Sequence, residues 1–126
     1  MRRGLDTNIL IYALDSEAGE KHNIAVGIVE DMLSNPEDYT VAAQVLAETL
    51  YVVKRKRVGE HLATRLVLAI VQRVPIVSYT SVEVLQSLNS PARHFWDRLL
   101  AYTYRNNGVE VIVSEDEKPY KEIIRV

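Results

Sequence analysis

The chain contains no cysteine. Disulfide bonds, zinc–thiolate sites and cysteine nucleophiles are therefore excluded. No run of residues is both apolar enough and long enough to form a membrane-spanning helix. A secretory signal peptide is not expected, because the apolar residues after Arg3 are interrupted at once by Asp6 and Asn8. These absences predict a protein of the reducing cytoplasm that is not attached to a membrane.

A large excess of charge of either sign is also missing, since the formal net charge is -2 and the pI is about 5.9. A protein that coats nucleic acid by charge alone is therefore not expected. An enzyme acting on nucleic acid remains compatible, because acidic metal ligands lower the net charge while local basic patches still hold phosphates. The 126 residues are 48% hydrophobic and contain no repeat, low-complexity tract or linker. We expect one folded domain spanning residues 1–126.

Hydrophobic periodicity and turn residues divide the chain into alternating strands and helices. Strands are expected at 3–6, 39–42, 76–79, 109–113 and 122–126. Helices are expected at 22–33, 43–57, 60–73 and 80–88, with a loop or short helix at 7–14. A last helix is expected to carry Trp96, Leu99, Leu100 and Thr103 and to end at Asn106-Asn107-Gly108. Gly59 is expected to end the helix at 43–57. The alternation predicts an α/β fold with a mostly parallel sheet, in which ligands bind beyond the carboxyl ends of the strands.

Two acidic residues interrupt apolar stretches. Asp6 follows the first expected strand, where a buried charge costs much free energy unless it is paired or binds a metal. The alternative is that Asp6 caps the helix that follows. Glu48 is the only charged residue between Val41 and Val53, and the alternative for it is a solvated helix face.

Asp97 and Asp116 are less distinctive by themselves. Asp97 lies beside an apolar helix stripe, and the alternative is an ion pair with Arg93, four residues earlier. Asp116 follows the strand expected at 109–113, and the alternative is a turn residue. The order and context of the four acids are more informative than any one of them.

Four stretches together resemble the PIN domain, a family of small nucleases that includes the VapC-type toxins of toxin–antitoxin pairs. They are LDTNILIYALD at 5–15, AAQVLAETLYVV at 42–53, FWDRLLAYTYRNNG at 95–108 and VIVSEDE at 111–117. The resemblance covers nearly the whole chain. It implies a three-layer α/β/α fold with a central, mostly parallel sheet, and a ribonuclease that cleaves RNA phosphodiesters as the toxin of such a pair.

Carried over residue by residue, the resemblance assigns four catalytic and metal-binding acids: Asp6, Glu48, Asp97 and Asp116. Polar residues would orient the carboxylates or water, namely Thr7, Asn8 and Ser114, and Glu115 is an alternative to Asp116 as the fourth acid. Mg²⁺ or Mn²⁺ suits such a site, because hard cations favour carboxylate and water oxygens. The metal would activate water and stabilise charge on the scissile phosphate, and the sequence leaves one or two ions open.

Basic residues outside this cluster are candidates for phosphate contacts. The densest run consists of Lys54, Arg55, Lys56 and Arg57. The alternative is a solvated helix end stabilised by the helix dipole. The partners implied by the resemblance are RNA, a small antitoxin protein and a second copy of the chain in a homodimer, with the helix faces at 24–33 and 62–70 as candidate surfaces.

Some residues depart from the family pattern. Gly4 stands where a bulky apolar residue is expected, and larger side chains stand where small ones are usual, at Arg98, Tyr102 and Tyr104. Two alternatives stand beside this resemblance. One is another α/β phosphohydrolase; a haloacid-dehalogenase-type phosphatase needs a second Asp at the position of Asn8, so that motif fails, and a P-loop is absent. A catalytically inactive PIN-like binding or assembly module is the other alternative, and the retention of all four acids argues against it.

Overall fold

Four short parallel strands form the central sheet of the computed structural model, which describes residues 1–126. The sheet order is β3-β2-β1-β4. In chain order the elements are β1 (Arg3–Leu5), α1 (Thr7–Leu14), α2 (Glu20–Ser34), η1 (Pro36–Asp38), β2 (Tyr39–Ala42), α3 (Ala43–Lys56), α4 (Glu60–Arg73), β3 (Ile76–Val77), α5 (Ser81–Gln86), η2 (Ala92–His94), α6 (Phe95–Asn106) and β4 (Val111–Val113).

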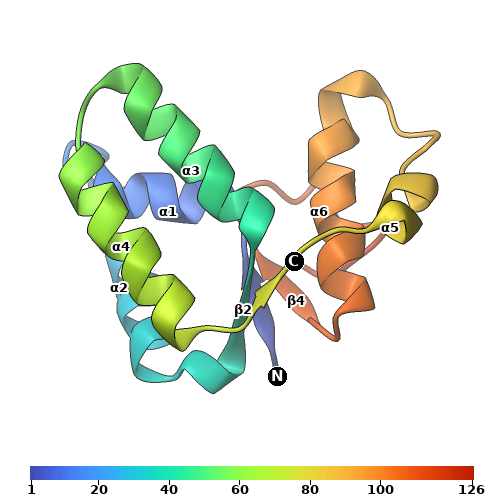
Figure 1. The fold of residues 1–126 in the computed structure, drawn as a ribbon, viewed down its shortest axis with the longest axis horizontal. Helices are drawn as coiled ribbons and strands as arrows, with labels where there is room; N and C mark the ends of the chain where they lie inside the picture. Colours follow the sequence, from blue (N-terminus) through green and yellow to red (C-terminus); the bar gives the residue numbers. More distant parts are fainter.

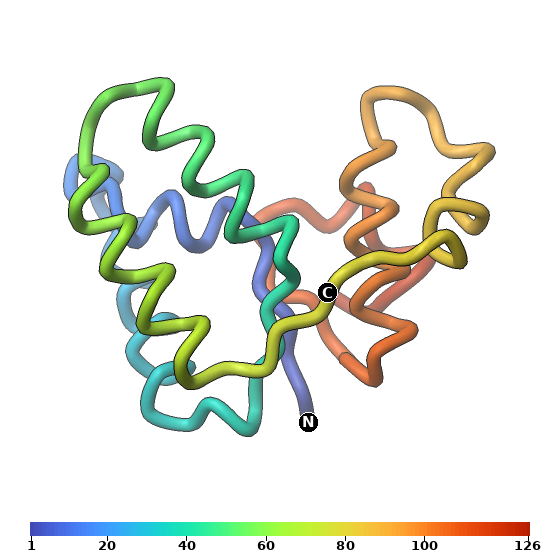
Figure 2. Tube along the Cα trace, viewed as in Figure 1, coloured from blue at the N-terminus to red at the C-terminus, as the bar shows by residue number.

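Helices cover both faces of this sheet. Helices α1–α4 lie on one side and α5 and α6 on the other (Figure 1). The chain completes α1–α4 before it crosses through β3 to α5 and α6 (Figure 2). The predicted three-layer α/β/α fold is therefore confirmed. None of the helices combines the length and the apolar character that a bilayer crossing requires.

The strand order reverses at β1. The chain builds the sheet from β1 through β2 to β3, and β4 then pairs with the other side of β1. In open parallel sheets, ligands bind outside the carboxyl ends of the strands at such a reversal point. Asp6 leaves β1 and Ser114 leaves β4 at this position, and the Asp6 amide donates to the Val113 carbonyl at 3.0 Å.

The hydrophobic core lies mainly between the sheet and the helices. Its largest fully buried members include Leu5, Leu10, Met32, Val41, Ile70 and Ile112. The apolar residues of β1 and β2 supply the centre of this core, because both faces of the sheet are covered by helices. The strand ends are thereby held rigidly, which fixes the residues that leave them.

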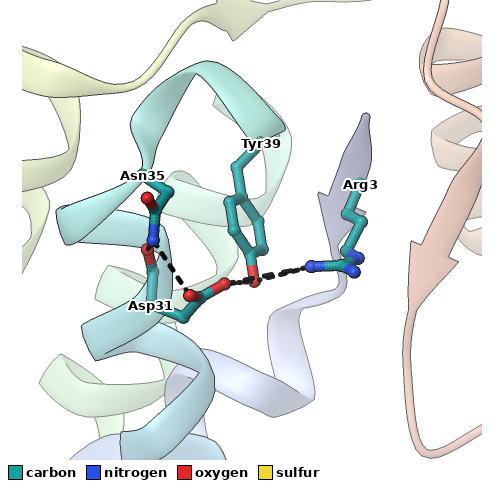
Figure 3. A network of polar contacts seen from close by, with 4 residues as sticks. All are labelled: Arg3, Asp31, Asn35 and Tyr39. Carbon is teal, nitrogen blue, oxygen red and sulfur yellow. Dashed lines mark hydrogen bonds and ion pairs between the residues drawn. The ribbon is translucent and has the colours of Figure 1, made fainter. Parts of the chain in front are cut away.

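A polar network closes the amino-terminal edge of the sheet, at the end opposite to Asp6 (Figure 3). The Tyr39 hydroxyl donates to Asp31 at 2.6 Å, and an Arg3 guanidinium nitrogen lies 3.4 Å from that hydroxyl. Asn35 donates to the other Asp31 oxygen at 3.0 Å. The network joins the end of α2 to β1 and β2.

The strand expected at 122–126 is not formed, and this prediction is wrong. Residues 118–123 form turns instead, in which the Ile123 amide donates to the Tyr120 carbonyl at 2.8 Å. Only one isolated bridge, between Val111 and Arg125, remains of a strand there. The turns bury the Tyr120 ring, which a straight edge strand would leave outside the core.

The remaining differences lie at the ends of elements. Helix α3 ends at Lys56, and its C-cap residue Arg57 adopts a left-handed conformation with φ of 56°, so the expectation that Gly59 ends it is wrong. Gly59, with φ of 75°, instead precedes α4. Helix α6 ends at Asn106, as expected. Strands β3 and β4 are shorter than expected, α2 is longer, and α5 stops at Gln86.

Candidate active site

Asp6 is the most firmly held acid at the carboxyl edge of the sheet. Its side chain is 7% exposed and caps α1 by accepting from the Thr7 amide at 2.7 Å. Its other oxygen accepts from the Ser114 hydroxyl at 2.6 Å and from the Tyr120 hydroxyl at 2.8 Å. Asp6 therefore does what the capping alternative proposed, and it is also fixed from β4 and the carboxyl-terminal turns.

Asp97 lies in the first turn of α6 and approaches Asp6 through a shared tyrosine. The Tyr120 hydroxyl lies 3.2 Å from an Asp97 oxygen while it contacts Asp6. Burial raises the pKa of Asp97, and the negative charge of Asp6 raises it further. The charge of Asp6 therefore acts on Asp97. No ion pair with Arg93 is formed.

Glu48 comes to the same place from the middle of α3. Burial raises the pKa of Glu48, and the charges of Asp6 and Asp97 add to this effect. A hydrogen bond from Gln44 at 2.9 Å acts in the opposite direction. Because like charges repel, Glu48 beside the carboxylates of Asp6 and Asp97 favours a cation or a proton that offsets their charge.

Asp116 and Glu115 differ in their surroundings. Both are exposed, but the charge of Asp116 contributes to the raised pKa of Asp97. The Asp116 amide donates to the Ser114 hydroxyl at 3.0 Å. Glu115 instead pairs with Lys21 at 2.5 Å and accepts a hydrogen bond from Tyr12, which directs it towards α1 and α2.

The polar residues around the acids are partly without partners. The Asn8 amide lies 3.5 Å from the Ser114 hydroxyl, which itself donates to Asp6. Three buried oxygens have no hydrogen-bond partner, and they belong to Thr7, Asn8 and Gln44. Buried polar atoms without a partner are uncommon and need an explanation. The Asn8 and Gln44 side chains contact Ser114 and Glu48, so their unpartnered oxygens are neutral hydrogen-bond acceptors close to the acids.

Tyr120 is the residue of this site that the sequence analysis missed. Burial raises the pKa of its hydroxyl, and the charges of Asp6 and Asp97 raise it further, so the hydroxyl remains a proton donor. The available sequence signal was one aromatic residue, beside Pro119, in the charged tail that follows Asp116. A strand expected at 122–126 gave no reason to place Tyr120 near Asp6, whereas the turns at 118–123 bring it there.

A groove lined by aromatic rings lies beside Glu48. It has a volume of about 520 Å³ and is lined by residues of α3, by Ser78 and Tyr79 directly after β3, and by Trp96 at the start of α6. Its aromatic side chains are exposed, at 62% for Tyr51, 40% for Tyr79 and 55% for Trp96. Unpaired bases stack on such rings.

The basic run at 54–57 lies at the far end of α3 from the sheet. Lys54 is six residues beyond Glu48, which corresponds to about 9 Å along a helix axis. All four of its side chains are exposed, and Lys54, Arg55 and Lys56 form the last turn of α3. This placement matches the helix-end alternative, and contact with RNA stays a prediction.

The site has the donor chemistry for a hard divalent cation, although no preformed cage is present. No three acidic or imidazole side chains are arranged so that they enclose an ion. Mg²⁺ retains several waters and is commonly held by one or two carboxylates together with substrate phosphates. Asp6 and Asp97, joined through one hydroxyl, fit this sparse mode of binding.

The fold and site define a class: an α/β/α domain whose acids gather at the reversal point of a parallel sheet. The family model of the PIN domain matches residues 5–124, and the chain belongs to the PIN domain family. The predicted family resemblance is therefore confirmed. A search of curated protein sequences finds no match.

Two solved structures show the same fold at low sequence identity. VapC20 of Mycobacterium tuberculosis, a toxin that cleaves the sarcin–ricin loop, has a TM-score of 0.73 and 19% identity, with 98% of each chain covered. VapBC2 of Rickettsia felis, bound to a DNA fragment from its promoter, has a TM-score of 0.62 and 20% identity. That match covers 98% of this chain and 93% of the other.

Proposed function

We propose that the protein is a divalent-metal-dependent ribonuclease that cleaves RNA phosphodiesters. The observation that carries this proposal is that Asp6 and Asp97 meet at the Tyr120 hydroxyl at the carboxyl edge of the sheet, and that the charges of both acids act on Glu48. Membership of the PIN domain family and the similar fold of VapC20, a toxin that cleaves RNA in the sarcin–ricin loop, support it.

Asp6 and Asp97 would hold Mg²⁺ or Mn²⁺, and Glu48 and Asp116 would supply further carboxylates. When bound, such an ion supplies charge stabilisation at the scissile phosphate and lowers the pKa of a coordinated water. Burial raises the pKa values of Glu48 and Asp97, and the charge of Asp6 raises both further, which supports this assignment because a cation would offset that charge.

The chain's own residues have distinct roles in this proposal. Ser114 and the Thr7 amide fix the orientation of Asp6. The buried oxygens of Thr7 and Asn8, which have no partner in the chain, would accept hydrogen bonds from water in the site. The Tyr120 hydroxyl is a hydrogen-bond donor to Asp6 and Asp97, and this contact holds the two like charges close together.

The aromatic groove supports a single-stranded substrate. Its three exposed rings adjoin Glu48 and present stacking surfaces to unpaired bases. In this arrangement a looped or single-stranded RNA places a base in the groove while its phosphate lies near the acids.

RNA cleavage by the purified full chain tests the function. We expect cleavage of a structured RNA with Mg²⁺ or Mn²⁺, and its loss with EDTA and in Asp6→Asn, which retains a side chain able to cap α1. Asp38→Asn, at an exposed acid of η1 remote from the site, is the matched control and should cleave like the wild type. Cleavage that survives both EDTA and Asp6→Asn, from protein free of contaminating ribonuclease, contradicts the proposal.

The biological setting that fits best is a toxin–antitoxin pair. The fold similarity to VapBC2 and VapC20 supports a small antitoxin partner that inhibits the nuclease. Exposed apolar residues on α2 and α4, namely Ile24, Leu62, Leu68 and Val71, provide surface for a partner or for a second copy of the chain. For the antitoxin, co-expression with the protein encoded by the neighbouring reading frame should yield an inactive complex.

For the homodimer, light scattering of the chain alone should yield the mass of a dimer.

A further inference from the structure

A strongly charged pocket lies next to the acidic cluster. It has a volume of about 550 Å³, and no hydrophobic side chain lines it. Two segments form its walls, residues 91–98 around the start of α6 and residues 117–122 in the carboxyl-terminal turns. The walls carry four permanent cations: Arg93, Arg98, Lys118 and Lys121. A small polar anion matches this lining better than an apolar ligand.

The two walls of the pocket are the same segments that supply the active site. Asp97 lies in the first turn of α6, between the lining residues His94 and Arg98. Tyr120, whose hydroxyl contacts Asp6 and Asp97, lies between the lining residues Pro119 and Lys121. The pocket and the acids are therefore built on the same turn of α6 and the same carboxyl-terminal turns.

Most of the positive charge in the pocket is available. Glu122 pairs with Arg98 at 2.8 Å. Arg93, Lys118 and Lys121 form no ion pair, and Glu117 is the only other acid in the lining. The pocket keeps a net charge of +2, although the whole chain has a net charge of -2. Unpaired cations that face one pocket repel one another, and they gain free energy when an anion enters.

We propose that this pocket is a phosphate subsite, which holds the RNA phosphodiester next to the one that lies at the acids. The inference rests on the proposed function for the identity of the polyanion, while the pocket itself is defined by Arg93, Lys118 and Lys121. Asp97 repels the phosphate backbone, and the adjacent cations offset this repulsion. They also fix which phosphate of the strand reaches the acids.

Binding of a short single-stranded RNA, measured by fluorescence anisotropy, tests this subsite without any cleavage. The full chain carries Asp6→Asn throughout, so that the RNA stays intact. Lys118→Ala with Lys121→Ala should raise the Kd about tenfold. It should also reduce the slope of log K against log salt by about 0.7 for each phosphate contact that is lost.

The matched control removes the same charge elsewhere. Arg65→Ala with Arg73→Ala, two exposed cations of α4, should leave both the Kd and the salt slope close to those of the parent. An unchanged Kd in the 118/121 variant, or an equal loss in the 65/73 variant, overturns the subsite. Circular dichroism confirms that both variants are folded.

A second arm separates the RNA from a free anion. Inorganic phosphate at millimolar concentration should compete with the RNA in the parent protein and lose this effect in the 118/121 variant. Phosphate binding that depends on Lys118 and Lys121, together with an unchanged RNA affinity, assigns the pocket to free phosphate and overturns the proposal. Because cleavage is measured separately, an inactive wild type contradicts the nuclease function but leaves this binding result intact.

Discussion

Gly4 and Tyr104 illustrate how two residues that depart from the family pattern compensate for each other. A Cβ atom at Gly4 would lie 2.8 Å from carbons of the fully buried Tyr104 ring. The Tyr104 hydroxyl donates to the Leu5 carbonyl and accepts from the Ala42 amide at 3.1 Å. It therefore bridges β1 and β2 where they diverge, directly before Asp6. The larger residue in α6 takes the volume that the glycine in β1 leaves free.

This contact predicts a strong coupling between the two positions. Gly4→Ala should cost about 1–3 kcal/mol in the free energy of unfolding, because overpacking forces the ring to shift. In a Tyr104→Leu background the same substitution should cost much less, which a double-mutant cycle by urea unfolding measures. Gly27→Ala in α2, where a Cβ meets no atom within 4 Å, is the control and should be neutral or stabilising. Additive effects of Gly4→Ala and Tyr104→Leu would contradict the coupling.

Tyr120 predicts a change in pH dependence and not only in rate. Its hydrogen bond lowers the pKa of Asp97 against the raising effects of burial and of Asp6. In Tyr120→Phe the pKa of Asp97 rises, so the carboxylate required for cation binding is lost at higher pH. The acid limb of the pH–rate profile should shift to higher pH, with activity about tenfold lower at neutral pH.

The control for this prediction is Tyr12→Phe. That substitution removes a hydroxyl that is hydrogen-bonded to Glu115. Glu115 is not among the groups that shift the pKa of Asp97. The acid limb should therefore stay where it is in the wild type. A Tyr120→Phe profile that is lower at every pH but has an unchanged midpoint would assign a purely structural role to the hydroxyl.

At the scale of elements, a single acid joins the two helices on one face of the sheet. Glu83 completes a capping box at the start of α5 by accepting from the Thr80 amide at 2.6 Å, and it accepts from Asn106 of α6 at 2.7 Å. These hydrogen bonds lower the pKa of Glu83 from 4.5 to about 2. The capping box involves only residues 80–83, whereas the contact to Asn106 depends on tertiary packing.

The depressed pKa of Glu83 gives a stability prediction with a definite sign. The unfolded chain binds a proton more readily, so the stabilisation is complete above pH 4.5 and is lost as the pH falls towards 2. Glu83→Ala should cost about 1–3 kcal/mol at neutral pH and much less near pH 2, as measured by urea unfolding at several pH values. Glu60→Ala, an exposed acid in the first turn of α4, should have a small effect at both. A cost of Glu83→Ala that does not change with pH would contradict the linkage.

The sequence predicted helices and inner strands well, because their periodicity is local. Strand β2 at 39–42 and helix α4 at 60–73 lie where they were expected. The carboxyl-terminal turns were missed, because the short apolar run of Ile123 and Ile124 has the pattern of a strand. The position of Tyr120 depends on its contacts with Asp6 and Asp97, residues far away in the sequence, and no local pattern encodes such contacts.

At the scale of the whole molecule, folding brings like charges together. Elements far apart in the sequence, namely the end of β1, α3 and α6, converge at one edge of the sheet. Burial there raises the pKa values of Glu48 and Asp97, and the charge of Asp6 raises both further. A raised carboxyl pKa means that the charged form is less favourable in the folded chain than in the unfolded one. This destabilisation exists above the folded-state pKa and is relieved as the pH falls through it.

Replacement of Glu48 by its neutral isostere should therefore stabilise the metal-free protein. In EDTA at neutral pH, Glu48→Gln should melt a few degrees above the wild type, since about 1 kcal/mol corresponds to roughly 2–8 °C for domains of this size range. This difference in melting temperature should vanish at acidic pH, where the wild-type carboxyl is protonated.

Mg²⁺ or Mn²⁺ should raise the melting temperature of the wild type more than that of the variant, because a cation that binds the folded state more tightly stabilises it more. Glu60→Gln, which removes an exposed charge, should follow the wild type under all these conditions. If Glu48→Gln melts at or below the wild-type temperature in EDTA, the acids do not repel one another strongly enough to require a cation.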